Sequence, residues 1–265
     1  MSSVPIRNSV TKISDSIWRL GCTIECNRTA EPDDTCAAAW KDGEDWYILR
    51  HTTSEQLPDA TSANSPVRLI HEGESETIKF VQDKAPQVPV PEVIYSWVDG
   101  NRSFLVLKRV PGITLRDAWE TMSATEQDSI LDEVVHIVRA LPGSLETGFI
   151  GAVECLSVRH FFREDLHPNP EIEERFHLYH PDLAPGNIIV SNQKLLAIIN
   201  WESAGFYPRF WISTKPSISR GMNFHPPIPG IEETEWRKRL RVKLEEHGYP
   251  RFADWFMEWM RTKSR

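Results

Sequence analysis

The chain has 265 residues, of which 30 are lysine or arginine and 38 are aspartate or glutamate, so its formal net charge at pH 7 is −8. This balance speaks against a general nucleic-acid binder and against docking on anionic lipid, because both need clustered basic residues. The 10 tryptophans and 11 phenylalanines exclude low-hydropathy disorder, so the sequence predicts a folded globular protein.

The sequence also carries expectations about the compartment. No apolar run approaches the roughly 20 residues needed to span a bilayer, and residues 1–13 lack the apolar stretch of a signal peptide. The 4 cysteines are too few for a disulfide scaffold, and no zinc-finger spacing follows Cys22, Cys26 and Cys36. We therefore expect a cytoplasmic protein with free thiols, no membrane partner and no nucleic-acid partner.

The first 110 residues predict an antiparallel sheet with one helix. An Asp-Gly turn signal at Asp42 separates two short apolar runs and predicts a hairpin. A polar segment rich in serine and threonine, 51–66, predicts a loop. Apolar spacing then predicts a helix over 67–81, with Glu74 on the same face as its apolar residues. The expected strands are 17–20, 36–40, 46–50, 93–97 and 103–110.

After Pro111 and Gly112 the pattern changes to helices. Ser123 and Glu126 form a capping-box pattern ahead of an amphipathic stripe that ends near Leu141. Two further amphipathic helices are expected over 232–247 and 251–261. Strands first and helices later predict an α+β fold in two lobes, with a first domain over 1–110 and a second over 111–265.

The residues from 180 to 211 carry the chemistry. His180 and Asp182 stand two apart before a Pro-Gly loop, and Asn187 follows. A carboxylate held near a histidine and an amide can accept the proton of a hydroxyl group. Two short apolar strands come next, and we expect their hairpin to bring Asn200 back beside Asn187.

This segment resembles the catalytic loop of the protein-kinase superfamily, where a His-x-Asp-x4-Asn pattern precedes a metal-binding aspartate. It is most similar to the aminoglycoside phosphotransferase-like family, especially to its short fungal members. The resemblance is carried by residues 180–190 (HPDLAPGNIIV) and 198–211 (IINWESAGFYPRFW). A weaker likeness covers 88–91 (VPVP) and 105–112 (LVLKRVPG), so it extends over most of the chain.

The resemblance implies a two-lobed protein-kinase-like fold and the transfer of the γ-phosphoryl group of ATP to a small-molecule hydroxyl with magnesium. It makes Asp182 the catalytic base, with His180 beside it, and makes Asn187 a metal ligand. Glu74 is the expected ion-pair partner of Arg50, with Glu72 and Glu76 as rivals. The residues expected to bind the cofactors are Arg50, Glu74, Lys108, Val110, Asn187 and Asn200, of which Asn187 and Asn200 would hold the metal.

Two positions depart from the family pattern. Residue 200 is asparagine where the family has aspartate, so one anionic magnesium ligand becomes a neutral carbonyl oxygen and metal binding is weakened. Residue 50 is arginine where the family has lysine, which is a milder change because a guanidinium also holds phosphate.

Three functions stay open at this point. The first is ATP-dependent phosphoryl transfer to a metabolite hydroxyl with a weakened magnesium site. The second is a repurposed enzyme of secondary metabolism that uses no ATP or other cofactor, with Asp182 as acid or base in a cyclisation, elimination or isomerisation. The third is a pseudokinase that binds a partner and catalyses no reaction.

Overall fold

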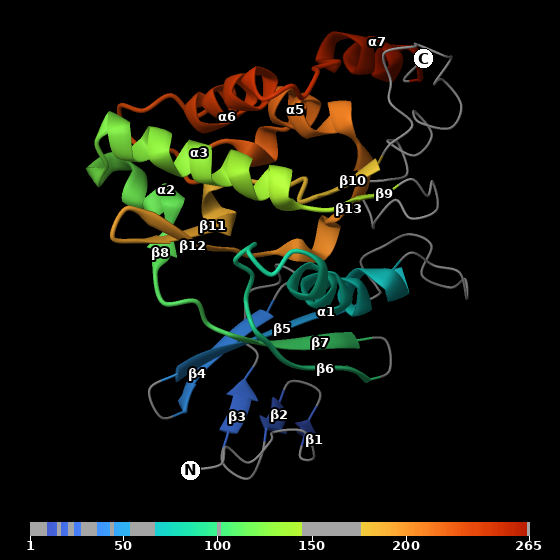
Figure 1. Ribbon diagram of the computed structural model, residues 1–265. Coiled ribbons are helices and arrows are strands. Elements are labelled where there is room, and N and C mark those ends of the chain that lie inside the picture. The colour runs from blue at the N-terminus through green and yellow to red at the C-terminus, as the bar shows by residue number, and fades with distance from the viewer. Residues whose placement is uncertain are drawn as a thin grey trace. The chain divides into compact units, whose positions relative to one another are not determined.

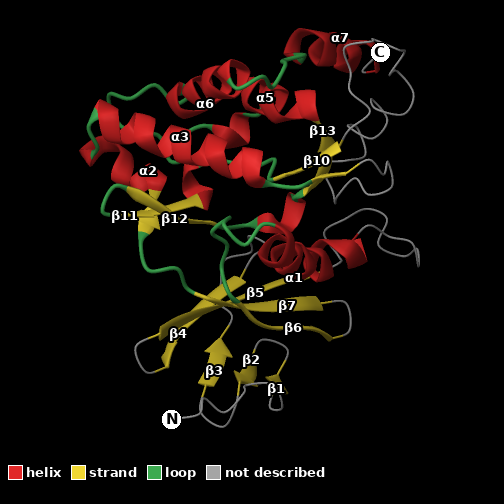
Figure 2. Ribbon diagram, in the orientation of Figure 1, coloured by secondary structure: helices red, strands yellow, loops and turns green. Residues whose placement is uncertain are grey.

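The chain forms two compact units. The structure is a computed structural model, and it describes residues 10–14, 17–20, 24–27, 36–42, 45–53, 67–99, 102–144 and 176–263 (Figures 1 and 2). The first unit comprises Met1–Ser75 and Pro91–Arg109, and the second comprises Glu76–Val90 and Val110–Arg265. The domain boundary expected between residues 110 and 111 stays a prediction. No helix in the described ranges is long and apolar enough to cross a membrane.

The main sheet of the first unit has four antiparallel strands in the order β4–β5–β7–β6. Leu105, Val106 and Leu107 of β7 are buried, as apolar residues of an inner strand usually are. A separate sheet has the order β1–β2–β3. The strands are β1 (Val10–Ser14), β2 (Ile17–Leu20), β3 (Ile24–Asn27), β4 (Cys36–Asp42), β5 (Asp45–Thr53), β6 (Val93–Asp99) and β7 (Arg102–Lys108).

The hairpin expected around Asp42 is present as the antiparallel pair β4–β5. Strand β5 continues through Thr53, so the first residues of the predicted loop 51–66 belong to the strand, because they pair with β7. The rest of that segment, 54–66, lies outside the described residues.

Helix α1 (Val67–Lys84) extends beyond Val81, where the sequence pattern ends it. Glu74, Ile78 and Val81 are fully buried, and their spacing of three and four residues places them on one face. The expected buried face of this helix is therefore confirmed. The helix ends at Lys84, two residues before Pro86, since proline cannot continue the backbone hydrogen-bond pattern.

The second unit holds two small sheets, ordered β12–β11–β8 and β13–β10–β9, and most of the helices. Its strands are β8 (Ile113–Thr114), β9 (Gly143–Ser144), β10 (Phe176–Tyr179), β11 (Ile188–Ser191), β12 (Lys194–Ile198) and β13 (Gly205–Pro208). Its helices are α2 (Leu115–Ala118), α3 (Ala124–Ala140), α5 (Arg209–Ile218), α6 (Glu235–Glu246) and α7 (Ala253–Lys263). Short 3-10 turns are η3 (Trp119–Thr121), η4 (Pro185–Asn187), η5 (Trp201–Ser203) and η6 (Arg220–Met222).

The predicted capping box starts α3. The Ser123 side chain accepts from the Glu126 N–H, and the Glu126 carboxylate accepts from the Ser123 N–H at 2.7 Å. The apolar stripe behind it, which includes Ile130 and Val134, is fully buried. Local sequence therefore sets both the start of this helix and the face that it buries.

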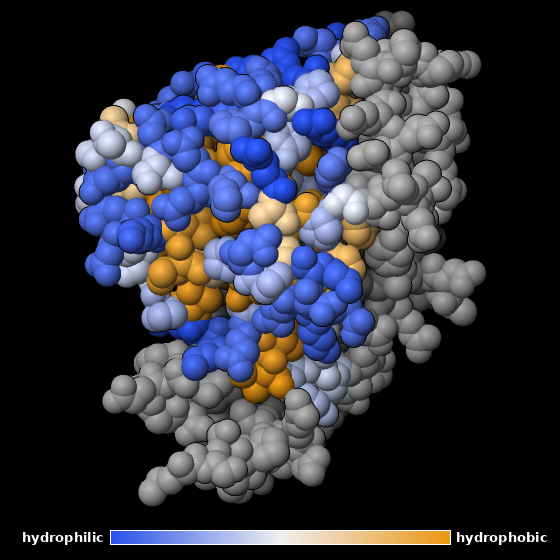
Figure 3. Space-filling view, viewed as in Figure 1, coloured by the Kyte–Doolittle hydropathy of each residue, from blue (hydrophilic) through white to orange (hydrophobic). Residues whose placement is uncertain are grey.

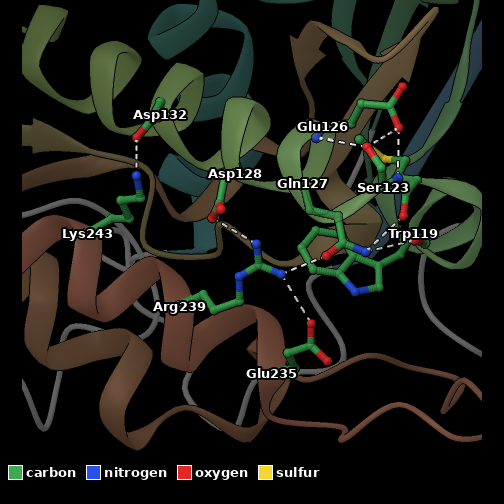
Figure 4. Close-up of polar contacts among 10 residues, drawn as sticks. Trp119, Ser123, Glu126, Gln127, Asp128, Asp132, Glu235, Arg239 and Lys243 are labelled. Atoms are coloured by element: carbon green, nitrogen blue, oxygen red, sulfur yellow. Dashed lines mark hydrogen bonds and ion pairs between the residues drawn. The ribbon is translucent and has the colours of Figure 1, made fainter.

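Charged side chains join α3 to α6, and hydrophilic residues dominate the surface over these helices (Figure 3). The Arg239 guanidinium donates to Asp128 at 2.8 Å and to Gln127 at 2.7 Å, and it lies over the Trp119 ring (Figure 4). Lys243 bonds Asp132 at 2.6 Å one turn further along. Beneath this seam the rings of Trp119, Phe224 and Trp236 pack together.

Helix α5 is not among the elements that the sequence pattern predicts. Its residues from Phe210 to Pro216 are all buried, so the helix has no solvent-exposed face along most of its length. A helix buried on every side lacks the amphipathic period that sequence analysis detects.

Candidate functional site

The segment between β10 and β11 is the loop that carries His180, Asp182 and Asn187. The Trp236 indole of α6 donates to the Leu183 carbonyl oxygen at 2.8 Å, and both residues are buried. A buried carbonyl satisfied in this way holds the loop against α6. Asp182 is half-buried, and its backbone is held in place through the hydrogen bond to the next residue, Leu183.

One amide group binds Asp182 twice. Asn187 Nδ2 donates to the Asp182 backbone oxygen at 2.9 Å and to Asp182 Oδ2 at 2.7 Å. Both partners are acceptors, so the NH2 group of the Asn187 amide must face them, and Asn187 Oδ1 points the other way. The carboxylate is therefore fixed, and the carbonyl oxygen of Asn187 remains usable as a ligand for a hard cation.

His180 supports the backbone of the same loop. Its side chain is 1% exposed, and its Nε2 donates to the Ile199 carbonyl oxygen at 3.0 Å while Nδ1 accepts from the Asp182 N–H at 3.3 Å. The Trp201 ring meets it edge-on, with 4.9 Å between ring centroids. Burial, the largest cause, lowers the pKa of His180, and the Asp182 charge only partly opposes it. These contacts suit a neutral imidazole that positions Asp182.

The hairpin β11–β12 brings Asn200 back to this loop. Asn192 and Gln193 both have positive φ at its turn, as a two-residue hairpin turn with the right twist requires. The Ile199 N–H donates to the Asn187 carbonyl oxygen at 2.9 Å, so Asn200 follows directly beside Asn187. Asn200 itself is left-handed, with φ 70° and ψ 54°, a conformation that asparagine tolerates better than most residues.

The oxygen donors on this loop are one carboxylate, from Asp182, and the amide carbonyls of Asn187 and Asn200. All are hard ligands of the kind that magnesium takes, and they carry one negative charge together. No cluster of three or more histidine, cysteine, aspartate or glutamate side chains suited to a metal occurs among the described residues. The set fits magnesium, more weakly than a set with a second carboxylate would.

Residues from η6 also lie beside Asp182, and sequence analysis does not find them. A β-carbon on Gly221 would stand 4.0 Å from Asp182 Oδ1 and 3.6 Å from Ser219 Oγ. Nothing in the local sequence of 219–223 signals this approach, because it is produced by packing between segments far apart in the chain.

The other expected cofactor residues are placed less completely. Arg50 lies on β5, and its side chain is outside the described part of the structure. Glu74 is fully buried on α1, whereas the Glu76 side chain is 75% exposed and pairs with Lys79. The pairing of Arg50 with Glu74 stays a prediction, and the side chain of the rival Glu72 is also outside the described residues.

At the end of β7, the Lys108 N–H donates to the Glu92 carbonyl oxygen at 2.9 Å. Lys108, with Arg50 and Glu74, belongs to the first unit, and Val110 belongs to the second. A cofactor site that combines them with Asp182 is a prediction.

Comparisons with known proteins bear on the fold. No protein-family model matches the sequence, and no curated protein matches it. Among solved structures, amicoumacin kinase hAmiN in complex with AMP-PNP, Ca2+ and Ami is 12% identical, with a TM-score of 0.51 over 83% of this chain and 70% of that chain.

Two aminoglycoside phosphotransferases give lower scores. A thermostable mutant of APH(4)-Ia, in ternary complex with AMP-PNP and hygromycin B, is 17% identical, with a TM-score of 0.49 over 82% of this chain and 83% of that chain. The type VIII aminoglycoside-3'-phosphotransferase is 13% identical, with a TM-score of 0.47 over 82% of this chain and 92% of that chain. At these identities a likeness shows the fold alone. With its antiparallel sheets and helical second unit, the chain has a two-lobed α+β, protein-kinase-like fold, as the sequence predicts.

Proposed function

We propose that the protein transfers the γ-phosphoryl group of ATP to a hydroxyl group of a small metabolite, with Asp182 as the base. The observation that carries this proposal is the pair of hydrogen bonds from one Asn187 amide to Asp182. They hold the Asp182 carboxylate and the Asn187 carbonyl oxygen, which would bind the metal, in one fixed arrangement. Phosphoryl transfer needs its base and its metal ligands in fixed positions.

The two oxygens of Asp182 have separate tasks. Oδ2 is held by Asn187, and Oδ1 faces Gly221, where an acceptor can approach. Asp182 Oδ1 takes the proton of the acceptor hydroxyl group. The hydroxyl oxygen bonds to the γ-phosphorus, and the bond from that phosphorus to ADP breaks. His180 holds the Asp182 backbone in place for this step.

Asn187 and Asn200 would hold magnesium through their side-chain oxygens, and magnesium would neutralise charge on the β- and γ-phosphates. In the same proposal Arg50, paired with Glu74, contacts the phosphates, and backbone groups at Lys108 and Val110 meet the adenine. Because Asn200 brings no charge, we expect weaker metal binding than a carboxylate at that position would give.

The test is a calorimetric titration of ATP with magnesium into the wild type, Asn200→Asp and Asn192→Asp. Asn192 is the matched control, since it is an exposed residue on the turn of the same hairpin and gains the same charge. We expect micromolar binding to the wild type, roughly tenfold tighter binding to Asn200→Asp, and no change for Asn192→Asp. Absence of ATP binding by both the wild type and Asn200→Asp would overturn the proposal.

Asp182→Asn separates binding from chemistry. This variant should still bind ATP, but acceptor-dependent ATP consumption should fall by about 10²- to 10⁴-fold, the usual contribution of a general base. Consumption unchanged from that of the wild type would remove Asp182 from the role of base.

Asn200 also favours a second candidate, an ATP-independent enzyme of secondary metabolism in which Asp182 acts as acid or base. It predicts a metabolite that is converted without ATP by the wild type and not by Asp182→Asn. The third candidate, a pseudokinase, predicts a stable complex with a partner and no conversion of any metabolite.

A further inference from the structure

Gly221, in the 3-10 turn η6, lies beside Asp182. The point where a β-carbon would stand on Gly221 is 4.0 Å from Asp182 Oδ1 and 3.6 Å from Ser219 Oγ. Gly221 is exposed and carries no side chain, so a group from solvent can reach this point. A hydroxyl group placed there would lie between a hydrogen-bonding hydroxyl and the carboxylate.

The two residues that precede Gly221 in the chain have side chains available for a ligand. The Ser219 hydroxyl caps no backbone group of η6, and Arg220 is exposed. Within the described ranges neither side chain forms a hydrogen bond or an ion pair. Arg220 offers five N–H donors in a planar fork that matches the oxygens of a carboxylate or phosphate.

A second guanidinium makes the neighbourhood positive. Arg237 Nε donates to Asn223 Oδ1 at 2.6 Å, and its Nη1 donates to the carbonyl oxygens of Pro216 and Ser217 at 3.0 and 2.9 Å. All these partners are uncharged, so the Arg237 charge is not neutralised by them. Burial is the main cause that lowers the pKa of Arg237, and the charge of Arg220 contributes to the same effect.

The nearby acidic group does not cancel this charge. Glu232, whose charge also acts on Arg237, forms an ion pair with Lys238. Arg220 and Arg237 together therefore exceed the single charge of Asp182. A cationic acceptor would meet two guanidinium groups, whereas an anionic group would replace solvent around Arg220 with charge-assisted hydrogen bonds.

We infer that the acceptor carries an anionic group, a carboxylate or a phosphate, which Arg220 binds while its hydroxyl lies over Gly221 between Ser219 and Asp182. This inference rests on the proposed phosphotransferase function. It makes Arg220 the residue that determines specificity, and it makes the missing side chain at Gly221 a condition for acceptor access.

The experiment measures binding without nucleotide, by saturation-transfer NMR at low ionic strength. The probes are matched pairs of hydroxy compounds: lactate and lactamide, mandelate and mandelamide, salicylate and salicylamide, and glycerol phosphate and glycerol. The first three pairs test a carboxylate and the last tests a phosphate. We expect at least one anionic member to bind the wild type and its neutral partner to give no signal.

Variants assign the binding to this place. Arg220→Gln should weaken binding of the anionic probe roughly tenfold, which is the usual effect of losing a hydrogen bond to a charged group. Gly221→Ala should weaken its signal and Gly221→Val should abolish it, because a β-carbon would occupy the point that the hydroxyl group takes, while it meets only ordinary van der Waals contacts within the protein. The matched control Arg261→Gln, which removes an arginine that is 72% exposed at the end of α7, should bind as the wild type does.

Loss of the anion preference in Arg220→Gln, with the preference kept in Arg261→Gln, supports the inference. Equal binding of charged and neutral probes, no binding of any anionic probe, or a preference that survives Arg220→Gln overturns it. The ATP titration is independent of these outcomes. A protein that binds ATP and rejects the anions would keep the proposed function and lose this inference, whereas one that binds the anions and not ATP would lose the proposed function.

Discussion

Acidification should destabilise the folded chain through His180. Its imidazole is buried, Nε2 donates to the Ile199 carbonyl oxygen, and Nδ1 accepts from the Asp182 N–H. A proton on Nδ1 would face that N–H donor, so the charged form would lose a hydrogen bond as well as its hydration. For this reason the pKa of His180 in the folded state lies below its ordinary value of 6.5.

The sign of the effect follows from proton uptake. As pH falls, the unfolded chain protonates this histidine before the folded chain does, so protonation favours unfolding. The contribution of His180 to the free energy of unfolding should therefore be constant above pH 6.5 and should decrease below it. The decrease is at most about 1.4 kcal/mol per pH unit, and it ends at the folded-state pKa of His180.

Urea unfolding of the wild type, His180→Gln and His136→Gln between about pH 5 and pH 8 measures this contribution. Glutamine cannot titrate, and its amide nitrogen can still donate toward Ile199. His136 is the matched control, because it is an exposed histidine on α3. We expect His136→Gln to follow the wild type and His180→Gln to lose less stability in acid. Parallel curves for the wild type and His180→Gln would refute the reasoning.

Three further substitutions test the packing around the site by urea unfolding. Gly112→Ala would place a β-carbon 2.6 Å from the Val190 backbone oxygen, so it should lower the free energy of unfolding by about 1–3 kcal/mol; an unchanged value would mean that β11 moves without cost. Trp236→Phe leaves the buried Leu183 carbonyl oxygen without its donor and should cost about 1–3 kcal/mol, and a neutral result would show that water replaces the indole. Arg239→Met removes the links across α3 and α6 and should cost about 1–2 kcal/mol, less at high salt; a loss independent of salt would assign the effect to packing alone.

Much of the loop chemistry was predictable because it depends on residues close in sequence. Asp182 and Asn187 are separated by one short turn, and the β11–β12 hairpin that returns Asn200 is set by two short apolar runs and a two-residue turn. The capping box before α3 is equally local. The roles assigned to these residues stay predictions.

Helix α5 was not predictable in the same way. Its buried residues follow no amphipathic period, and Pro216 inside it argues against a helix on propensity. Tertiary burial overrides both signals. The hydrogen bonds of Arg237 were not predictable either. They join it to Asn223, Pro216 and Ser217, which are too far away in the sequence for a local pattern to indicate the contacts.

The amino-acid sequence by itself determined the α+β order of elements, the loop from His180 to Asn187 and the amide at position 200, because periodicity and short spacings act over a few backbone torsions. Only the tertiary structure decided that Gly221 lies against Asp182 and that Arg237 bonds Asn223 and Pro216. Such approaches depend on how α5, η6 and α6 pack, and packing sums many weak contacts that no local pattern records.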